Sequence, residues 1–184
     1  MEIRFKPTEL PGVLVVEPAV FPDSRGHFLE LYHREKYRGH GIEPDFVQDN
    51  FSHSAKGVLR GLHFQVRRPQ AKLVTALRGE IFDVVVDLRP DSPAFGKWLG
   101  VRLSGERKTQ IFVPEGFAHG FCVLSETADV HYKCSQLYDP ADEGGILWSD
   151  PELGIAWPID RPILSGKDAR SGSFREAVSL ISKA

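Results

Sequence analysis

Apolar and polar residues alternate with a period of two along most of the chain. Ile3 and Phe5 alternate with charged residues near the start, and short runs of this kind recur as far as residue 134. Successive side chains of a strand point to opposite faces, so this period predicts strands. The predicted strands are residues 13–16, 28–32, 46–54, 58–64, 73–77, 81–88, 98–103, 110–113, 117–124 and 130–134.

Residues typical of turns separate these runs. About ten short strands with such turns between them indicate a sandwich or barrel, and we expect a mainly β fold of the double-sheet jelly-roll kind. The turn segments are Pro22-Asp23-Ser24, Arg78-Gly79, Pro90-Asp91-Ser92-Pro93, Ser104-Gly105 and Pro114-Glu115-Gly116.

Two segments have a helical rather than a strand pattern. A short helix is predicted around residues 33–38 and is ended by Gly39. A second is predicted in the C-terminal tail, residues 173–182, where Ser173 and Glu176 have the spacing of a capping box. No internal repeat or linker interrupts the pattern, so we expect one domain over residues 1–184 with short peripheral helices.

Composition narrows the class of protein. The 23 basic and 25 acidic side chains give a net charge of −2, so the chain lacks the basic field that holds nucleic acid, and we expect no nucleic-acid partner. Charged residues interrupt the apolar runs of the first twenty residues, which predicts neither a signal peptide nor a membrane span, so we expect a cytoplasmic protein with no membrane partner. Cys122 and Cys134 are expected to be reduced, partly buried thiols.

Two separated segments match the spacing of the cupin motifs, which are Gly-x5-His-x-His, a short gap, Glu-x6-Gly, and Pro-x-Gly-x-x-His. Gln65 stands where the motif has its second His, and Lys72 stands where it has Glu. An amide and an amine are poor ligands for a divalent cation, so we expect no metal and no cofactor, and acid–base chemistry in a retained pocket. The residues that match this frame are Gly57, His63, Gln65, Lys72, Gly79, Pro114, Gly116 and His119.

Nine further motifs occur in the chain: DSRGHFLE (23–30), QDNFSHS (48–54), GVLRGLHFQ (57–65), SPAFGKW (92–98), PEGFAHGF (114–121), YKC (132–134), YDP (138–140), WSDP (148–151) and LSGKD (164–168). In this order and spacing they resemble the dTDP-4-dehydrorhamnose 3,5-epimerase family of cupins, the third enzymes of dTDP-L-rhamnose synthesis. The resemblance covers about residues 2–170. After Asp168 the tail lacks a proline that the family often has there, so the packing of the tail stays open, but no motif residue is affected.

Epimerisation beside a ketone needs a base and an acid on opposite faces of a carbon. His63 suits the base, since a free imidazole has a pKa of about 6.5. The resemblance implies that Asp168 orients His63 and that Tyr132 is the acid; Tyr132 should face away from His131 and Lys133 on its strand. Without the resemblance, a core histidine, a core aromatic residue and a solvated turn aspartate remain alternatives for these three.

The ammonium group of Lys72 could stabilise negative charge on the C4 oxygen of the sugar, with His119 assisting. The resemblance further implies a set of contacts to the nucleotide sugar, in which guanidinium groups suit phosphate oxygens. Arg60 conflicts with this set. It lies three residues before His63, an odd spacing, so in a regular strand its side chain should point away from the base unless the strand bends. The implied substrate-binding residues are Arg25, Glu30, Gln48, Asn50, Arg60, His119, Tyr138, Glu143 and Lys167.

The resemblance also implies a homodimer that pairs through its N-terminal strands, with Arg25 and Glu30 reaching the partner's pocket, and pairing would cover open sheet edges. The expected substrate is a dTDP-4-keto-6-deoxy sugar, inverted at C3 and C5. Two alternatives stay open: a related cupin that acts at one carbon or isomerises the ketone, and a non-catalytic sugar-binding cupin. The preference for thymidine over uridine is open as well.

Overall fold

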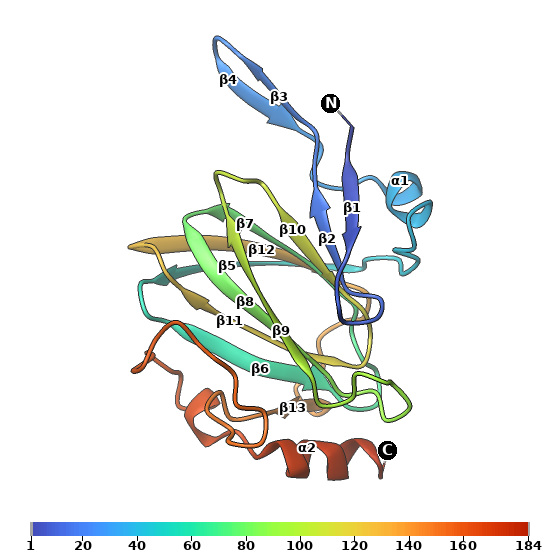
Figure 1. Ribbon diagram of the computed structural model, residues 1–184, viewed down its shortest axis with the longest axis vertical. Helices are drawn as coiled ribbons and strands as arrows, with labels where there is room; N and C mark the ends of the chain where they lie inside the picture. The colour runs from blue at the N-terminus through green and yellow to red at the C-terminus, as the bar shows by residue number, and fades with distance from the viewer. Residues whose placement is uncertain (1, 184) are drawn as a thin grey trace.

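A computed structural model, which describes residues 2–183, contains two antiparallel sheets that face each other (Figure 1). This arrangement confirms the mainly β jelly-roll prediction, and each predicted run overlaps an observed strand. The six-stranded sheet has the order β1 (Arg4–Pro7), β2 (Leu14–Glu17), β10 (Gln110–Val113), β7 (Lys72–Arg78), β12 (Thr127–Cys134) and β5 (Gln48–Ala55). The five-stranded sheet has the order β13 (Glu143–Gly145), β6 (Leu59–Gln65), β11 (Phe117–Val123), β8 (Glu80–Asp87) and β9 (Trp98–Ser104).

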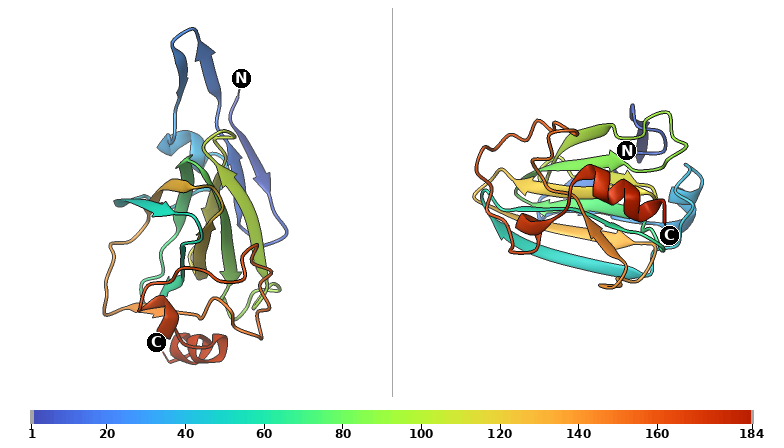
Figure 2. Two further views of the ribbon diagram at one scale, coloured as in Figure 1. Left: turned by 90° about the vertical axis from the view of Figure 1, so that its left-hand side faces the viewer. Right: turned by 90° about the horizontal axis from the view of Figure 1, so that it is seen from below.

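A hairpin of β3 (Val20–Asp23) and β4 (Gly26–Leu29) projects from the body of the molecule (Figures 1 and 2). The strand predicted at residues 28–32 is found instead at Gly26–Leu29, and β3 was not predicted. Both strands are largely exposed, so no buried face imposes a clear alternation on their sequence. Phe21 and Phe28 remain 50% and 69% exposed on this hairpin.

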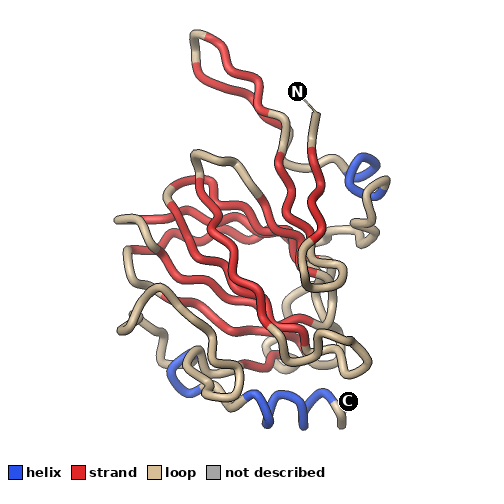
Figure 3. Tube along the Cα trace, in the orientation of Figure 1, coloured by secondary structure: helices blue, strands red, loops and turns tan. Residues whose placement is uncertain are grey.

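Short helices lie at the periphery of the sheets, as predicted (Figure 3). The helix α1 (Arg34–Arg38) is followed by Gly39 at its C-cap. The helix α2 (Phe174–Ile181) begins with the predicted capping box, in which Ser173 and Glu176 hydrogen bond reciprocally. It lies beside the end of the five-stranded sheet that carries β13 and β6 (Figures 1 and 2), and buries Phe174 and Ala177. A 3₁₀ turn, η1 (Asp168–Arg170), was not predicted.

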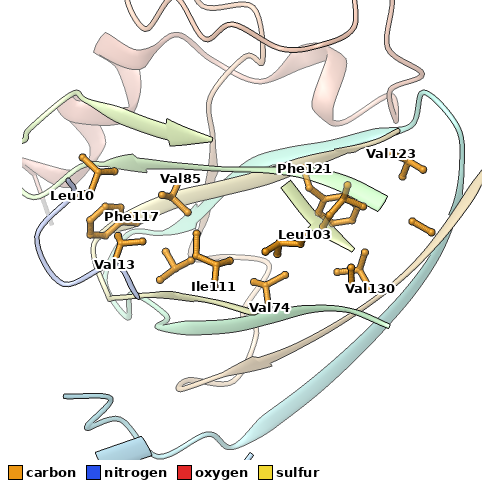
Figure 4. Packing of buried hydrophobic residues seen from close by; sticks show 14 of the residues in the cluster. Leu10, Val13, Val74, Val85, Leu103, Ile111, Phe117, Phe121, Val123 and Val130 are labelled. Atoms are coloured by element: carbon orange, nitrogen blue, oxygen red, sulfur yellow. The ribbon is translucent and has the colours of Figure 1, made fainter. Parts of the chain in front are cut away.

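The main hydrophobic core lies between the two sheets (Figure 4). Val74 and Val130 extend from one sheet toward Val85 and Phe121 of the other, because alternate side chains of every strand point inward. Burying each such side chain contributes about 1.5–3 kcal/mol. Tyr132 packs against this cluster, so the apolar core is continuous with the wall of the cavity described below.

Both cysteines are free thiols, and they are fully buried where partial burial was predicted. Burial raises the pKa of Cys122 to about 11 and also raises the pKa of Cys134, so both are protonated at neutral pH. Within residues 2–183, no helix is both long and apolar enough to cross a membrane.

Candidate active site

A cavity of about 480 Å³ opens between the sheets, beside the main core. Strands of both sheets form its walls, and residues that follow β13 close one side. Eleven of the thirteen site residues predicted from the sequence line it, and the structure thereby brings together positions that lie far apart along the chain. These are Gln48, Asn50, Arg60, His63, Lys72, His119, Tyr132, Tyr138, Glu143, Lys167 and Asp168.

His63 forms a pair with Asp168, whose position is 105 residues away in the chain. Nε2 of His63 lies 2.6 Å from Oδ1 of Asp168. An ionised carboxylate only accepts hydrogen bonds, so Nε2 carries the hydrogen and Nδ1 keeps a lone pair. None of the described residues hydrogen bonds to Nδ1. The pair therefore leaves one ring nitrogen of His63 able to accept a proton, on a side chain that lines the cavity.

Asp168 is buried and is held in place by its own turn. Ser165 Oγ donates to Asp168 Oδ2 at 2.8 Å, and the Asp168 amide donates back to Ser165 Oγ at 3.0 Å. Burial acts to raise the pKa of Asp168, but the hydrogen bonds from His63 and Ser165 outweigh it and leave the pKa lowered. Asp168 is therefore an ionised acceptor and not a solvated turn residue.

Tyr132 comes from β12, on the six-stranded sheet, whereas His63 comes from β6 of the facing sheet. As predicted, its neighbours His131 and Lys133 take the opposite face of the strand, where both contact Asp49. Burial raises the pKa of the Tyr132 phenol, so it stays protonated at neutral pH and can act as a proton donor.

Lys72 and His119 occupy the inner part of the cavity wall and are 9% and 6% exposed. Burial lowers the pKa of Lys72, while the nearby Asp83 acts in the opposite direction. Asp83 is fully buried, and its Oδ2 accepts a hydrogen bond from His119 Nε2 at 2.9 Å. A buried carboxylate thus fixes the orientation of His119 and adds negative charge near Lys72.

The two substituted cupin positions do not form a metal cage. Gln65 is engaged by backbone groups, accepting from the Asp139 amide at 2.8 Å and donating to the Arg68 carbonyl at 2.8 Å. In the described part of the chain, no group of three or more His, Cys, Asp or Glu side chains has an arrangement that could hold a metal ion. The donor set therefore does not fit a tightly bound divalent cation, and the absence of a metal requirement stays a prediction.

Arg60 faces the same cavity as His63 although the two are three residues apart. The bend that this requires is present. The pairing of β6 with β11 shifts register between His119 and Phe121 of β11. On the β6 side, Gly61, which lies between Arg60 and His63, has φ of 118°. Arg60 Nε donates to Ser54 Oγ at 3.0 Å. The conflict noted from strict alternation is thus resolved by a β-bulge.

The rim of the cavity carries a connected polar network. Tyr138 donates to Glu143 at 2.7 Å, and Lys167 contacts both carboxylate oxygens of Glu143 at 2.7 and 2.8 Å. The hydrogen bond to Glu143 raises the pKa of Tyr138 to about 12. Gln48 accepts from the Tyr138 amide at 2.8 Å and donates to Asn50 at 3.0 Å. This rim offers both donors and acceptors to a polar ligand.

Arg25 and Glu30 do not line the cavity of their own chain. Arg25 is in the turn between β3 and β4, where its side chain is 88% exposed and pairs with Asp23. Glu30, just after β4, pairs with Lys36 at 2.8 Å. Among the predicted site residues, these two would need a second molecule to reach a cavity.

Sequence reasoning missed Asp83 and Ser165. A signal existed for each. Asp83 interrupts an apolar run that predicts a buried strand, which indicates a carboxylate with a buried partner. Ser165 precedes Asp168 by three residues, a spacing at which a hydroxyl and a carboxylate commonly hydrogen bond.

The jelly roll with a His–Asp pair, a buried lysine and a partly buried tyrosine in one cavity defines an acid–base site on a cupin scaffold. The family model described as dTDP-4-dehydrorhamnose 3,5-epimerase matches residues 7–176, and the chain belongs to this family of isomerases. It is 51% identical over 178 residues to the dTDP-4-dehydrorhamnose 3,5-epimerase of Methanothermobacter thermautotrophicus, covering 95% of this chain and 96% of that one.

Two further relatives bear on the substrate. The crystal structure of the dTDP-6-deoxy-D-glucose-3,5-epimerase of Legionella pneumophila in complex with dTDP-4-keto-L-rhamnose superposes with a TM-score of 0.92 at 48% identity, covering 97% of this chain and 94% of that chain. The dTDP-4-dehydrorhamnose 3-epimerase of Streptomyces niveus is 44% identical over 177 residues, which cover 95% of this chain and 86% of that protein.

Proposed function

We propose that the protein epimerises C3 and C5 of dTDP-4-dehydro-6-deoxy-D-glucose to give dTDP-4-dehydro-L-rhamnose, a step of dTDP-L-rhamnose synthesis. Membership of the family supports the reaction class. The observation that carries the proposal is the His63–Asp168 pair at 2.6 Å in a cavity shared with Tyr132 and Lys72. These four side chains supply a base, its orienting carboxylate, an acid and a cation.

The first step is removal of a proton next to the C4 ketone. His63 Nδ1 accepts the proton, and Asp168 stabilises the imidazolium through the hydrogen bond to Nε2. The electron pair of the C–H bond becomes part of an enolate, whose negative charge is on the C4 oxygen. The Lys72 ammonium stabilises this charge, and the low dielectric of the cavity strengthens the interaction.

The second step is delivery of a proton to the other face of the same carbon. Tyr132 donates its phenolic proton, which inverts the configuration and leaves a phenolate. Transfer of the proton held by His63 back to Tyr132, through solvent, restores both groups. The same cycle at the other carbon completes the isomerisation with no net change of atoms or charge.

The nucleotide part of the substrate would be held at the rim. Arg60 and Lys167 offer positive charge to the diphosphate, and Gln48 and Asn50 offer amide groups. We further propose that the protein is a homodimer in which the hairpin of one protomer supplies Arg25 and Glu30 to the cavity of its partner.

Hydrogen exchange with deuterated water tests the two proton-transfer roles separately. In deuterated water, wild-type protein should label and invert C3 and C5 of dTDP-4-dehydro-6-deoxy-D-glucose, as read by NMR. His63→Ala should lower labelling and inversion together, by a factor on the order of 10² to 10⁴. Tyr132→Phe should still form the enolate and return labelled starting material with little inverted product.

His53→Ala and Tyr32→Phe are matched controls. His53 also pairs with an aspartate, Asp129, but outside the cavity, and Tyr32 packs on Tyr37 away from the cavity. Both should retain wild-type rates, as should wild-type protein after exhaustive chelation. Labelling that survives in His63→Ala, or that disappears in Tyr132→Phe, would show that the base and acid are assigned wrongly.

Epimerisation at one carbon is the second candidate function. The name of the Streptomyces niveus relative, a 3-epimerase, favours it. The same NMR measurement separates the candidates, because a 3-epimerase would invert C3 and leave C5 with its original configuration. Absence of labelling at both carbons would instead favour a sugar-binding protein.

A further inference from the structure

Gln65 stands in place of a metal-ligating histidine, and the chemistry proposed above gives it no role. It is the last residue of β6, is 5% exposed and lines the cavity. Its Oε1 accepts from the Asp139 amide at 2.8 Å, and its Nε2 donates to the carbonyls of Arg68 at 2.8 Å and Leu137 at 3.4 Å. Each end of this buried amide is therefore occupied by backbone.

The pattern of partners explains why an amide suits this position. The Asp139 amide needs an acceptor, while the Arg68 and Leu137 carbonyls need donors. A carboxylate could serve only the first, and an apolar side chain would remove the partner of all three groups, whose hydrogen bonds to Gln65 are partly buried. The glutamine therefore links the end of β6 to two loops at once.

One of these loops, residues 135–142, connects β12 to β13 and so bridges the two sheets. It carries Tyr138, whose ring is about half exposed and whose hydroxyl contacts Glu143. The Tyr138 amide donates to Gln48 Oε1 at 2.8 Å, and the next amide along the chain is the one held by Gln65. Two glutamine oxygens thus fix two consecutive peptide groups, and they fix the backbone from which the Tyr138 ring extends.

We infer that Gln65 is a positioning residue for catalysis that acts through Tyr138. By holding the peptide groups on both sides of Tyr138, it sets the place of this ring at the cavity rim and hence the place of the sugar between His63 and Tyr132. The inference rests on the proposed function, because it assigns Gln65 an effect on turnover. A residue that only stabilised the loop would affect unfolding but would not act through Tyr138.

A double-mutant cycle between Gln65 and Tyr138 tests the inference. Gln65→Leu should lower kcat by about 10- to 100-fold, the effect of misplacing a substrate by roughly 1 Å, with a smaller change in KM. Tyr138→Ala should also lower kcat. If Gln65 acts through Tyr138, the double variant should be no slower than Tyr138→Ala alone. If the decreases in kcat of the two single variants multiply in the double variant, the inference is overturned.

Gln136→Leu is the matched control, since it makes the same substitution at an exposed position of the same loop and should leave kcat unchanged. Gln65→Glu is the second variant if Gln65→Leu fails to fold, because it keeps the side-chain length and the acceptor for Asp139, while it loses the donor and adds a negative charge opposite the two carbonyls. Combined with Tyr138→Ala, it should likewise give a double variant that is no slower than Tyr138→Ala alone.

Amide hydrogen exchange gives a readout that does not depend on turnover. The Asp139 amide should exchange at least about tenfold faster in Gln65→Leu than in wild type, because its buried acceptor is lost. Unchanged exchange would overturn the inference even in an inactive protein. Wild-type protein that neither labels nor inverts the sugar would instead contradict the proposed function, so the two failures can be told apart.

Discussion

Lys72 combines a lowered pKa with a proposed role, stabilisation of the enolate, that requires its charge. Burial is the largest cause of the shift, and the neighbouring acidic groups only partly oppose it. As pH rises, the Lys72 ammonium is therefore lost below the value of 10.5 expected for an ordinary lysine. Tyr132 shifts the other way, so its phenol deprotonates above its ordinary 10.0. The first alkaline loss of activity should thus belong to Lys72.

The dependence of kcat on pH checks this assignment. Wild-type protein should lose activity with increasing pH at a midpoint below 10.5, the ordinary pKa of lysine. Lys72→Arg keeps a cation whose pKa lies above about 12, so its alkaline limb should move to higher pH even if its overall rate is lower. Lys133→Met, one position from Tyr132 on the opposite strand face, should leave the limb in place. An unmoved limb in Lys72→Arg would contradict the role of Lys72.

Single side chains also show where sequence reasoning ends. The period of two placed Tyr132 on the face opposite its neighbours, and the structure agrees. The pairing of His63 with Asp168 spans 105 positions, so no local pattern could supply it, and only the family resemblance did. Asp83 was missed because its partner His119 lies on another strand, and strand pairing had not been worked out from the sequence.

At the scale of elements, the bulge between β6 and β11 gives the site its shape. Gly61 has φ of 118°, and a Cβ there would lie 2.6 Å from Gly120 Cα and 2.8 Å from the His119 carbonyl oxygen. Backbone atoms cannot give way as a flexible side chain can. The bulge therefore depends on glycine at this position, and it turns both Arg60 and His63 toward the cavity.

Gly61→Ala should lower the free energy of unfolding by about 3 kcal/mol, since backbone strain and overpacking each cost about 1–3 kcal/mol. Gly41→Ala is the control: φ there is 88°, but no atom lies within 4 Å of the added Cβ, so only a strain cost of about 1 kcal/mol is expected. Urea unfolding of the two variants measures both values. Equal losses would mean that the close approach of Gly61 to β11 is unimportant.

Most elements with a buried face could be predicted, and those without one could not. The capping box of α2 is a local pattern and was found correctly. The strand β13 (Glu143–Gly145) has three residues and no alternation, so it is defined only by its pairing with β6. The hairpin of β3 and β4 is largely exposed and lacks a core-facing pattern for the same reason.

At the scale of the whole molecule, the projecting hairpin suggests how two protomers could share their sites. The hairpin extends away from the body of its own chain (Figure 2). It carries Arg25 and two exposed phenylalanines, Phe21 and Phe28. Exposed aromatic side chains beside a cation are typical of surfaces that become buried in a partner. A symmetric dimer would bury both hairpins at once, because each protomer gives and receives the same element.

Complementation between inactive variants tests this exchange directly. His63→Ala removes the base from a cavity, and Arg25→Ala removes the cation that the cavity would receive from the partner. In a mixed dimer of the two variants, one cavity would carry both defects, while the other would combine an intact His63 with the intact Arg25 of the partner chain. Co-refolding equal amounts of the two variants should therefore restore about one quarter of the wild-type activity, since random pairing makes half of the dimers mixed and each mixed dimer has one complete cavity.

The control is a mixture of His63→Ala with Tyr132→Phe, which should restore no activity. His63 and Tyr132 line the cavity of their own chain, so every cavity in this mixture lacks one of the two. A mixture of the first pair that remains inactive, or wild-type protein that sediments as an active monomer, would show that Arg25 does not serve a partner.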